Sequence, residues 1–185
     1  MNLPAEPSDE ELMIRTREGD RSAYDQLMLR HRERLVGYLQ RLSGQVEVAL
    51  DLAQEAFLRI YLHRHNYEPR ARFQTFLFHV ATNLLRNRFR ARQREVAFVD
   101  PVHLHQVPGR ERADPAEQAD LQARFREAVD ELPAHYREVV ILRLEEELPF
   151  QEIARILEIR PGTARERMRV AREKLQVRLE GFLEE

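Results

Sequence analysis

The sequence predicts an all-α protein with two small helical domains joined by a flexible linker, the second domain carrying a helix-turn-helix. Apolar residues recur at helical spacing, three or four positions apart, through most of the chain. The segment 95–116 lacks this periodicity, which is typical of a linker. Its linker-type residues are Pro101, Pro108, Gly109 and Pro115. The predicted domains are therefore residues 1–94 and 117–185, on either side of the linker.

Composition limits the class of protein. A length of 185 residues is enough for two small domains with their own cores. There is no cysteine, which excludes disulfides and thiolate metal sites and suits a reducing compartment. No apolar run is long enough to span a bilayer, and the N-terminus lacks the pattern of a signal peptide. We therefore expect a cytoplasmic protein.

Charge is distributed unevenly, although the formal net charge is only −2. Residues 63–94 contain eight arginines and a single acid, Glu68, whereas residues 95–131 contain nine acids and four arginines. This acidic stretch separates two basic segments, the second in the arginine-rich C-terminal part, which indicates two nucleic-acid-binding surfaces with a self-repelling connector.

The first domain begins with two helices that have clear end signals. Ser8-Asp9-Glu10-Glu11 has the form of a capping box and predicts a short helix that ends at Gly19. Asp20 or Ser22 can cap the second helix, which ends at Gly44. Its apolar stripe comprises Tyr24, Leu27, Met28, His31, Leu35, Tyr38, Leu39 and Leu42.

A third helix is predicted from residue 45 to about residue 65. The residues expected to face inward are Ala49, Leu52, Ala53, Ala56, Phe57 and Ile60. The outer side carries Asp51, Gln54, Glu55 and Leu58. This outer ridge is either a solvated helix face or a docking surface for a protein partner.

A loop and a fourth helix follow. Residues 63–70 are polar and include Pro69, which predicts a loop. The packing stripe of the helix comprises Phe73, Phe76, Leu77, Val80, Ala81, Leu84 and Leu85. Its other face comprises Thr75, His79, Asn83, Arg86, Asn87 and Arg90, and Arg88, Arg92 and Arg94 follow. Arginines can hold phosphates while histidine, asparagine and aromatic side chains contact unstacked bases.

The second domain begins with a helix from near Asp114 that stops at Leu132-Pro133, followed by a helix over residues 135–147. Glu145-Glu146-Glu147 at its end is interpreted as a solvated run, because consecutive helical residues point in different directions. His63 and His65 could bind a metal, but the chain has no cysteine and neither histidine has a ligand partner four residues away on a helix. His31 lies on a packing stripe. We expect no metal site, no other cofactor and no catalytic residue.

The segment 148–179 predicts a short helix, a turn and a longer helix. The buried stripe of the longer helix comprises Ala164, Met168, Ala171, Leu175 and Leu179. The opposite face comprises Gly162, Arg165, Glu166, Arg169, Arg172 and Gln176. Such a helix suits the major groove of DNA. The alternative is an ordinary helical hairpin with a solvated charged face.

Several separated motifs together resemble the extracytoplasmic-function (ECF) group of bacterial sigma factors. In the first half they are Asp51-Leu52-Ala53-Gln54-Glu55-Ala56-Phe57 and Phe73-Gln74-Thr75-Phe76-Leu77, continuing through Ala81-Thr82-Asn83-Leu84 to Arg86. In the second half they are Leu132-Pro133, Gln151-Glu152-Ile153-Ala154 and Gly162-Thr163-Ala164-Arg165 with Arg167. Their order across two domains is specific, although each motif alone is weak.

The resemblance implies an RNA polymerase sigma subunit with no active site of its own. Core polymerase would bind Asp51, Gln54 and Glu55. The minus-10 element would be captured by the loop 63–72 with His79, Asn83, Arg86, Asn87 and Arg90. The minus-35 element would be read by Arg165, Glu166 and Arg169, with Arg160, Thr163 and Arg172 on phosphates.

Some positions depart from the family pattern. Where Glu166 and Asn87 stand, the family often has serine and aspartate. A glutamate in the groove favours a cytosine amino group and repels phosphates, so the family pattern does not fix the minus-35 preference of this chain. Arg167 could pair with Glu152 or contact DNA.

We expect a separate protein to regulate the chain, and two other functions remain as alternatives. No sensing domain is recognisable after Leu179, so we expect control by a separate protein, an anti-sigma factor. A stand-alone helix-turn-helix regulator would instead bind duplex DNA without polymerase. A metal-dependent hydrolase would need paired acidic ligands, whereas the acids here are dispersed.

Overall fold

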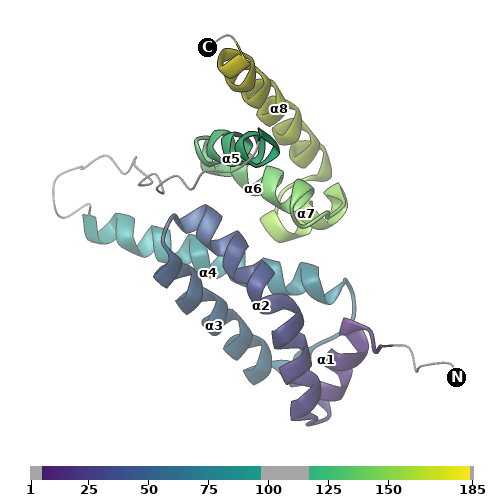
Figure 1. Cartoon of the computed structure of the whole chain (residues 1–185). Coiled ribbons are helices and arrows are strands. Elements are labelled where there is room, and N and C mark those ends of the chain that lie inside the picture. The colour runs from purple at the N-terminus through teal and green to yellow at the C-terminus, as the bar shows by residue number, and fades with distance from the viewer. Residues whose placement is uncertain (1–5, 97–116, 184–185) are drawn as a thin grey trace, which may run out of the picture. The chain divides into compact units, whose positions relative to one another are not determined.

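The computed structural model describes residues 6–96 and 117–183, and describes side chains for residues 6–92 and 123–179. Every regular element in these described ranges is a helix, which confirms the all-α fold class. The described residues form two compact units, one on each side of the gap (Figure 1). Residues 97–116 of the predicted linker lie outside the described residues.

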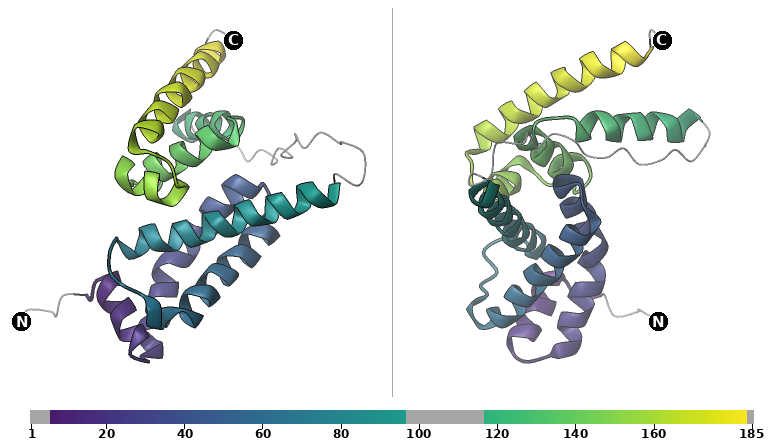
Figure 2. Two further views of the ribbon diagram at one scale, coloured as in Figure 1. Left: turned by 180° about the vertical axis from the view of Figure 1, so that it is seen from behind. Right: turned by 90° about the vertical axis from the view of Figure 1, so that its left-hand side faces the viewer.

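The first unit consists of four α-helices and one 3₁₀ helix, seen from two further sides in Figure 2. They are α1 (Asp9–Arg17), α2 (Arg21–Ser43), α3 (Val46–Leu62), the 3₁₀ helix η1 (Arg64–Asn66) and α4 (Phe73–Val96). Helix α2 packs against α1, α3 and α4, so it is the central element of the unit. The third predicted helix is therefore two elements, α3 and η1.

The ends of α1 and α2 follow the predicted capping signals. Ser8 Oγ accepts from Glu11 N at 3.2 Å, and Glu11 Oε2 accepts from Ser8 N at 2.7 Å, which completes the capping box. Asp20, and not Ser22, caps α2, with Oδ1 accepting from Ala23 N at 3.1 Å. Gly44 ends α2 at φ +71°, a left-handed conformation that glycine adopts without strain.

The core of the first unit includes one buried polar pair and a correction to the predicted face of α4. Tyr38 Oη and Thr82 Oγ1 lie 2.9 Å apart between α2 and α4. Thr75, expected on the DNA-facing side of α4, is instead buried, and Phe78, absent from the predicted stripe, is fully buried. Because α1, α2 and α3 all pack against α4, its buried arc is wider than one stripe.

The second unit contains α5 (Glu117–Asp130), α6 (Ala134–Leu144), α7 (Phe150–Leu157) and α8 (Pro161–Leu183). Helix α8 packs against the other three. Its predicted stripe is buried at Ala164, Met168, Ala171 and Leu175 and half-buried at Leu179. Glu158 ends α7 at φ +55°, and Pro161 begins α8, as the predicted turn requires.

The segment between α6 and α7 differs from the prediction. Helix α6 ends at Leu144, so Glu145, Glu146 and Glu147 are not helical. Leu148 N donates to Leu142 O at 3.0 Å, which folds the chain back and buries Leu148. This turn also buries Glu146, so the expectation that all three glutamates are solvated is wrong for Glu146.

Among the described helices, none has the length and apolar character that crossing a bilayer requires.

Candidate nucleic-acid and polymerase interfaces

The outer face of α8 lies opposite its buried stripe. Arg165, Glu166, Arg169 and Arg172 are all exposed, and so are Arg160 and Thr163 at the start of the helix. This separation arises because residues three or four positions apart share one face of a helix. The sequence-predicted minus-35 residues therefore form one continuous exposed surface, which begins at the helix N-terminus.

Arg169 is not an isolated cation on this surface. Its Nε and Nη2 donate to the two carboxylate oxygens of Glu166, at 3.1 and 2.7 Å, and its Nη1 donates to Glu173. The hydrogen bonds from Arg169 lower the pKa of Glu166 below its usual value. Sequence reasoning named Glu166 and Arg169 separately and missed Glu173, although its spacing from Arg169 is that of a helical ion pair.

Phe150, in the first turn of α7, contributes an aromatic ring to this region. The guanidinium of Arg143 lies 5.2 Å from the ring centre, and that of Arg165 lies 6.0 Å away. Arg143 also donates to Leu148 O at 3.0 Å. A cation over an aromatic face is weakly attracted to it. The side chain of Arg165 on α8 therefore lies near the aromatic ring of α7.

The exposed face of α4 contains the predicted minus-10 residues. His79, Asn83 and Arg86 are half-buried, whereas Asn87 and Arg90 are exposed. Asn83 Nδ2 and His79 Nε2 lie 3.1 Å apart, so these two side chains are in hydrogen-bonding contact across one helical turn. The face offers hydrogen-bonding groups followed by arginines, the order needed to contact bases and then phosphates.

The loop before α4 is anchored by an aromatic residue that sequence reasoning did not single out. Tyr67 is only 5% exposed, and its ring centre lies 5.7 Å from that of Phe76. Burial, and then the nearby carboxylates of Glu10 and Asp9, raise the pKa of the Tyr67 hydroxyl to about 12. By contrast Glu68 and Arg70, which pair at 2.5 Å, are exposed. The loop is thus fixed at Tyr67 and open to solvent after it.

The outer ridge of α3 is the third exposed surface. Asp51 and Gln54 are exposed, and Glu55 accepts from Arg59 at 2.6 Å. Asp51 Oδ2 lies 4.0 Å from Arg88 Nη1, so one of the predicted docking residues lies next to an arginine of α4.

Exposed apolar side chains continue this ridge along α3. They are Val46, Leu50, Leu58 and Leu62, spaced four or eight residues apart. The exposed Gln54 occupies the position between Leu50 and Leu58. We call this set the α3 apolar row. Sequence reasoning found only Leu58. Because each step of four residues turns a helix about 40° beyond a full circle, this row winds around α3, and within it Leu58 and Leu62 share the face of Asp51. Exposed apolar side chains beside polar ones are typical of a protein-binding surface.

Metal-binding geometry is absent from the part of the chain that the structure describes, since no three His, Asp or Glu side chains gather into a candidate site. His31, on the stripe of α2, is buried, and its Nε2 lies 2.6 Å from Asp9 Oδ2.

Family comparison accounts for both units. The family described as Sigma-70 region 2 matches residues 27–95, and that described as Sigma-70, region 4 matches residues 122–175. The ECF RNA polymerase sigma factor SigW of Bacillus subtilis is 30% identical over 183 residues, covering 91% of this chain and 98% of SigW. The RNA polymerase sigma factor CarQ of Myxococcus xanthus is 34% identical over 164 residues, covering 89% of this chain and 93% of CarQ.

A solved structure supports the same assignment. The sigma factor RpoE of Bartonella quintana, crystallised with the anti-sigma factor NepR, has a TM-score of 0.71 and 27% sequence identity, covering 85% of this chain and 96% of RpoE. The similarity covers 85% of the chain and so includes residues of both helical units. A stand-alone regulator that shared only the helix-turn-helix would be similar in the second unit alone. Sequence and fold agree that the chain belongs to the ECF group of RNA polymerase sigma factors.

Proposed function

We propose that this sigma factor works through three separate surfaces: the α3 ridge binds core polymerase, the α4 face captures the opened minus-10 strand, and the α8 face reads the minus-35 element. The observation that carries the proposal is that each predicted set of residues lies outside the buried stripe of its helix, in exposed or half-buried positions. Each surface can therefore bind a partner without unpacking the core.

Core polymerase binds Asp51, Gln54 and Glu55, with Leu58 and Leu62 on the same side of α3 widening the contact. Polar groups beside apolar ones match the composition of protein interfaces, in which a buried apolar centre is surrounded by polar contacts. Leu58 follows Gln54 by one helical turn and is 53% exposed, so it can be buried on docking.

Strand capture involves His79, Asn83, Arg86, Asn87 and Arg90, together with the loop 63–72. These groups bind unstacked bases and phosphates, which the closed duplex does not offer in the same form. Binding only the separated strand shifts the closed-to-open equilibrium of the promoter.

On α8, Arg165, Glu166 and Arg169 contact base edges while Arg160, Thr163 and Arg172 hold phosphates. Arginine suits guanine, and a glutamate carboxylate accepts from the amino group of cytosine. In the free protein Glu166 and Arg169 are paired with each other, so reading DNA requires this pair to separate or to bind as a unit.

RNA synthesis itself remains with the polymerase, and the sigma factor needs no cofactor or catalytic residue of its own. Two weak DNA contacts joined on one enzyme bind with higher avidity than either alone. The segment 95–116, which contains four acids and two arginines, connects the two DNA-binding units. Because its partners are polymerase and promoter DNA, the protein acts in the cytoplasm.

A separate anti-sigma factor is the proposed regulator. The Bartonella quintana RpoE was solved with such a partner. In this chain the α3 apolar row and its polar neighbours are exposed, and an inhibitor that covers them would prevent polymerase binding.

The deciding experiment is copurification of the full chain with bacterial core RNA polymerase, followed by run-off transcription on a promoter library. We expect a stable complex and transcripts from promoters that share two elements at fixed spacing. Tight binding to duplex DNA with no affinity for core polymerase would contradict the proposal.

A further inference from the structure

Helix α1 precedes the residues matched by the sigma family, which begin at residue 27, yet it is part of the core. Leu12 and Met13 are fully buried, and Thr16 donates from Oγ1 to Leu12 O at 2.8 Å. The helix packs on α2, on η1 and on α4. It therefore connects the centre of the unit with both ends of the loop before α4.

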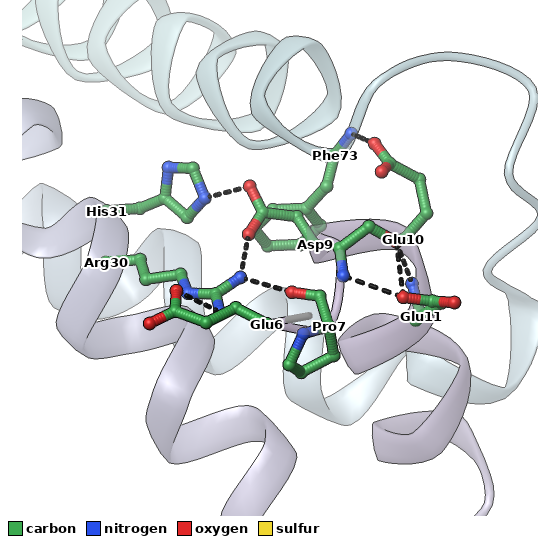
Figure 3. A network of polar contacts seen from close by, with 9 residues as sticks. Glu6, Pro7, Asp9, Glu10, Glu11, Arg30, His31 and Phe73 are labelled. Atoms are coloured by element: carbon green, nitrogen blue, oxygen red, sulfur yellow. Dashed lines mark hydrogen bonds and ion pairs between the residues drawn. The ribbon is translucent and has the colours of Figure 1, made fainter. Parts of the chain in front are cut away.

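Asp9 anchors α1 to the middle of α2 (Figure 3). Its Oδ1 accepts from Arg30 Nη1 at 3.0 Å, and its Oδ2 lies 2.6 Å from His31 Nε2. Arg30 also donates to Pro7 O at 2.8 Å. Two adjacent residues of α2 therefore bind the start of α1, at both carboxylate oxygens of Asp9 and at the carbonyl of Pro7.

Glu10 makes a second contact, at the N-terminus of α4 (Figure 3). Its Oε1 accepts from Phe73 N, the first amide of α4, at 2.8 Å. The first amides of a helix have no partner within it, and negative charge is favourable there. Arg72 precedes α4 and its side chain has no acceptor atom. Glu10 therefore supplies from another helix the acceptor that the local sequence lacks.

Arg17 makes the third contact, at the other end of the same segment. Its Nη1 donates to Tyr67 O at 3.4 Å, in a partly buried position. Tyr67 is itself packed against Phe76, while Glu68, Pro69 and Arg70 between the two fixed ends are exposed. The segment 67–73 is thus held by α1 at both ends and open to solvent between them.

We infer that α1 is a brace that positions the segment 67–73 and the first turn of α4 for strand capture, with Glu10 and Arg17 as positioning residues. This inference rests on the proposed role of the loop and α4 in binding the minus-10 strand. A segment ordered during folding loses no further backbone freedom on binding DNA, so its affinity for the strand is higher than that of a mobile loop.

The test uses the full chain with core polymerase and a promoter selected from the library. The variants are Glu10→Ala, Glu10→Gln and Arg17→Gln. The controls are Glu18→Gln, an exposed acid at the end of α1, and Arg32→Gln, an exposed arginine of α2. Three quantities are measured: amide hydrogen exchange of residues 67–73, affinity for core polymerase, and the rate of open-complex formation.

We expect Glu10→Ala to speed exchange in residues 67–73 and to slow opening about fivefold, the effect of losing one helix cap, with core affinity unchanged. Glu10→Gln keeps an oxygen acceptor and should restore most of the opening rate. Arg17→Gln should loosen the segment near Tyr67 and slow opening, whereas both controls should behave as the unmodified protein.

Three outcomes would overturn the inference. If Glu10→Ala and Arg17→Gln open promoters normally while Asn83→Ala does not, the brace is wrong and the strand-capture proposal stands. If Asn83→Ala also opens promoters normally, strand capture by α4 fails and the inference fails with it. If Glu10→Ala weakens core binding as much as opening, α1 only supports the stability of the unit.

Discussion

The guanidinium of Arg169 makes a two-point contact with the carboxylate of Glu166, its Nε 3.1 Å from Oε2 and its Nη2 2.7 Å from Oε1. Both side chains are more than half exposed, so water screens the pair and its contribution to stability is small. The contact matters for recognition, because it holds an acceptor and a donor side by side on the face of α8. Such a pair can present a hydrogen-bond acceptor and a hydrogen-bond donor together to one base pair or to two neighbouring base pairs.

Replacing Glu166 with alanine should change the minus-35 preference. The variant loses the acceptor for a cytosine amino group and frees one side of Arg169, so discrimination at one base pair should fall by about tenfold. Duplex affinity should also become more dependent on salt, because a carboxylate near the phosphates is removed. Selection of minus-35 sequences with the holoenzyme, at two salt concentrations, measures both effects.

Glu173→Ala is the matched control for this experiment, since it also removes one carboxylate from Arg169. It should alter salt dependence without changing the preferred bases. An unchanged sequence profile in Glu166→Ala would remove Glu166 from base reading.

Asn83→Ala and Arg86→Ala should impair open-complex formation while leaving core polymerase affinity intact. Asn83 contacts His79 on the half-buried face of α4, and each substitution removes a group proposed to bind the separated strand. Loss of one such contact should slow opening by about tenfold. Fluorescence of a base in the melted region gives the opening rate, and a binding titration gives the core affinity.

Arg32→Ala, on an exposed position of α2, controls for the loss of a positive charge and should open promoters normally. Equal loss of opening and of core binding in Asn83→Ala would show that the substitution disturbs the whole unit and would contradict the assigned role.

The sequence was sufficient for α8 because its residues follow a single period. Its buried stripe and its charged face both appear where the spacing of Ala164, Met168, Ala171 and Leu175 places them. Helix α4 was less predictable, since three other helices pack on it and draw Thr75 and Phe78 into the core. Helical periodicity describes one packing direction, and a helix covered from several directions buries residues outside that stripe.

Contacts between distant residues were the other part that local pattern could not predict. Glu10 was recognised as part of a capping box, but its bond to Phe73 N joins positions 63 residues apart. Likewise, Tyr67 looks like a loop residue until Phe76 and Arg17 are placed beside it. The turn after α6 could not be predicted from local pattern either. There the hydrogen bond from Leu148 N to Leu142 O folds the chain back, and Glu146 is buried in the turn.

Leu58→Ser should weaken binding to core polymerase without destabilising the free protein. Leu58 is 53% exposed on the α3 ridge, so the free protein loses little buried apolar area. If its side chain becomes buried on docking, affinity should fall by more than about 1 kcal/mol. The measurements are a core-binding titration and a thermal unfolding curve.

Leu29→Ser is the matched control, because Leu29 is 81% exposed on α2 and lies outside the proposed ridge. We expect Leu29→Ser to change neither the affinity for core polymerase nor the thermal unfolding curve. Comparable loss of core affinity in both variants would mean that the α3 apolar row is not the docking surface.

The cap of α2 should give the first unit a component of stability that disappears in acid. Hydrogen bonds from Arg15 and from the backbone of Ala23 lower the pKa of Asp20 to about 2, from an ordinary value of 3.8. Because the folded pKa is depressed, this stabilisation is complete above about pH 4 and is lost as pH falls through about 2.

The variant Asp20→Asn tests this, because it keeps a capping oxygen but not the charge. Its unfolding midpoint should therefore lie below that of the unmodified protein at neutral pH and converge with it between about pH 4 and 2. Circular dichroism melts across that range measure the difference, with Glu33→Gln, exposed in the middle of α2, as the control. A difference that stays constant down to pH 2 would show that the charge of Asp20 does not stabilise the cap.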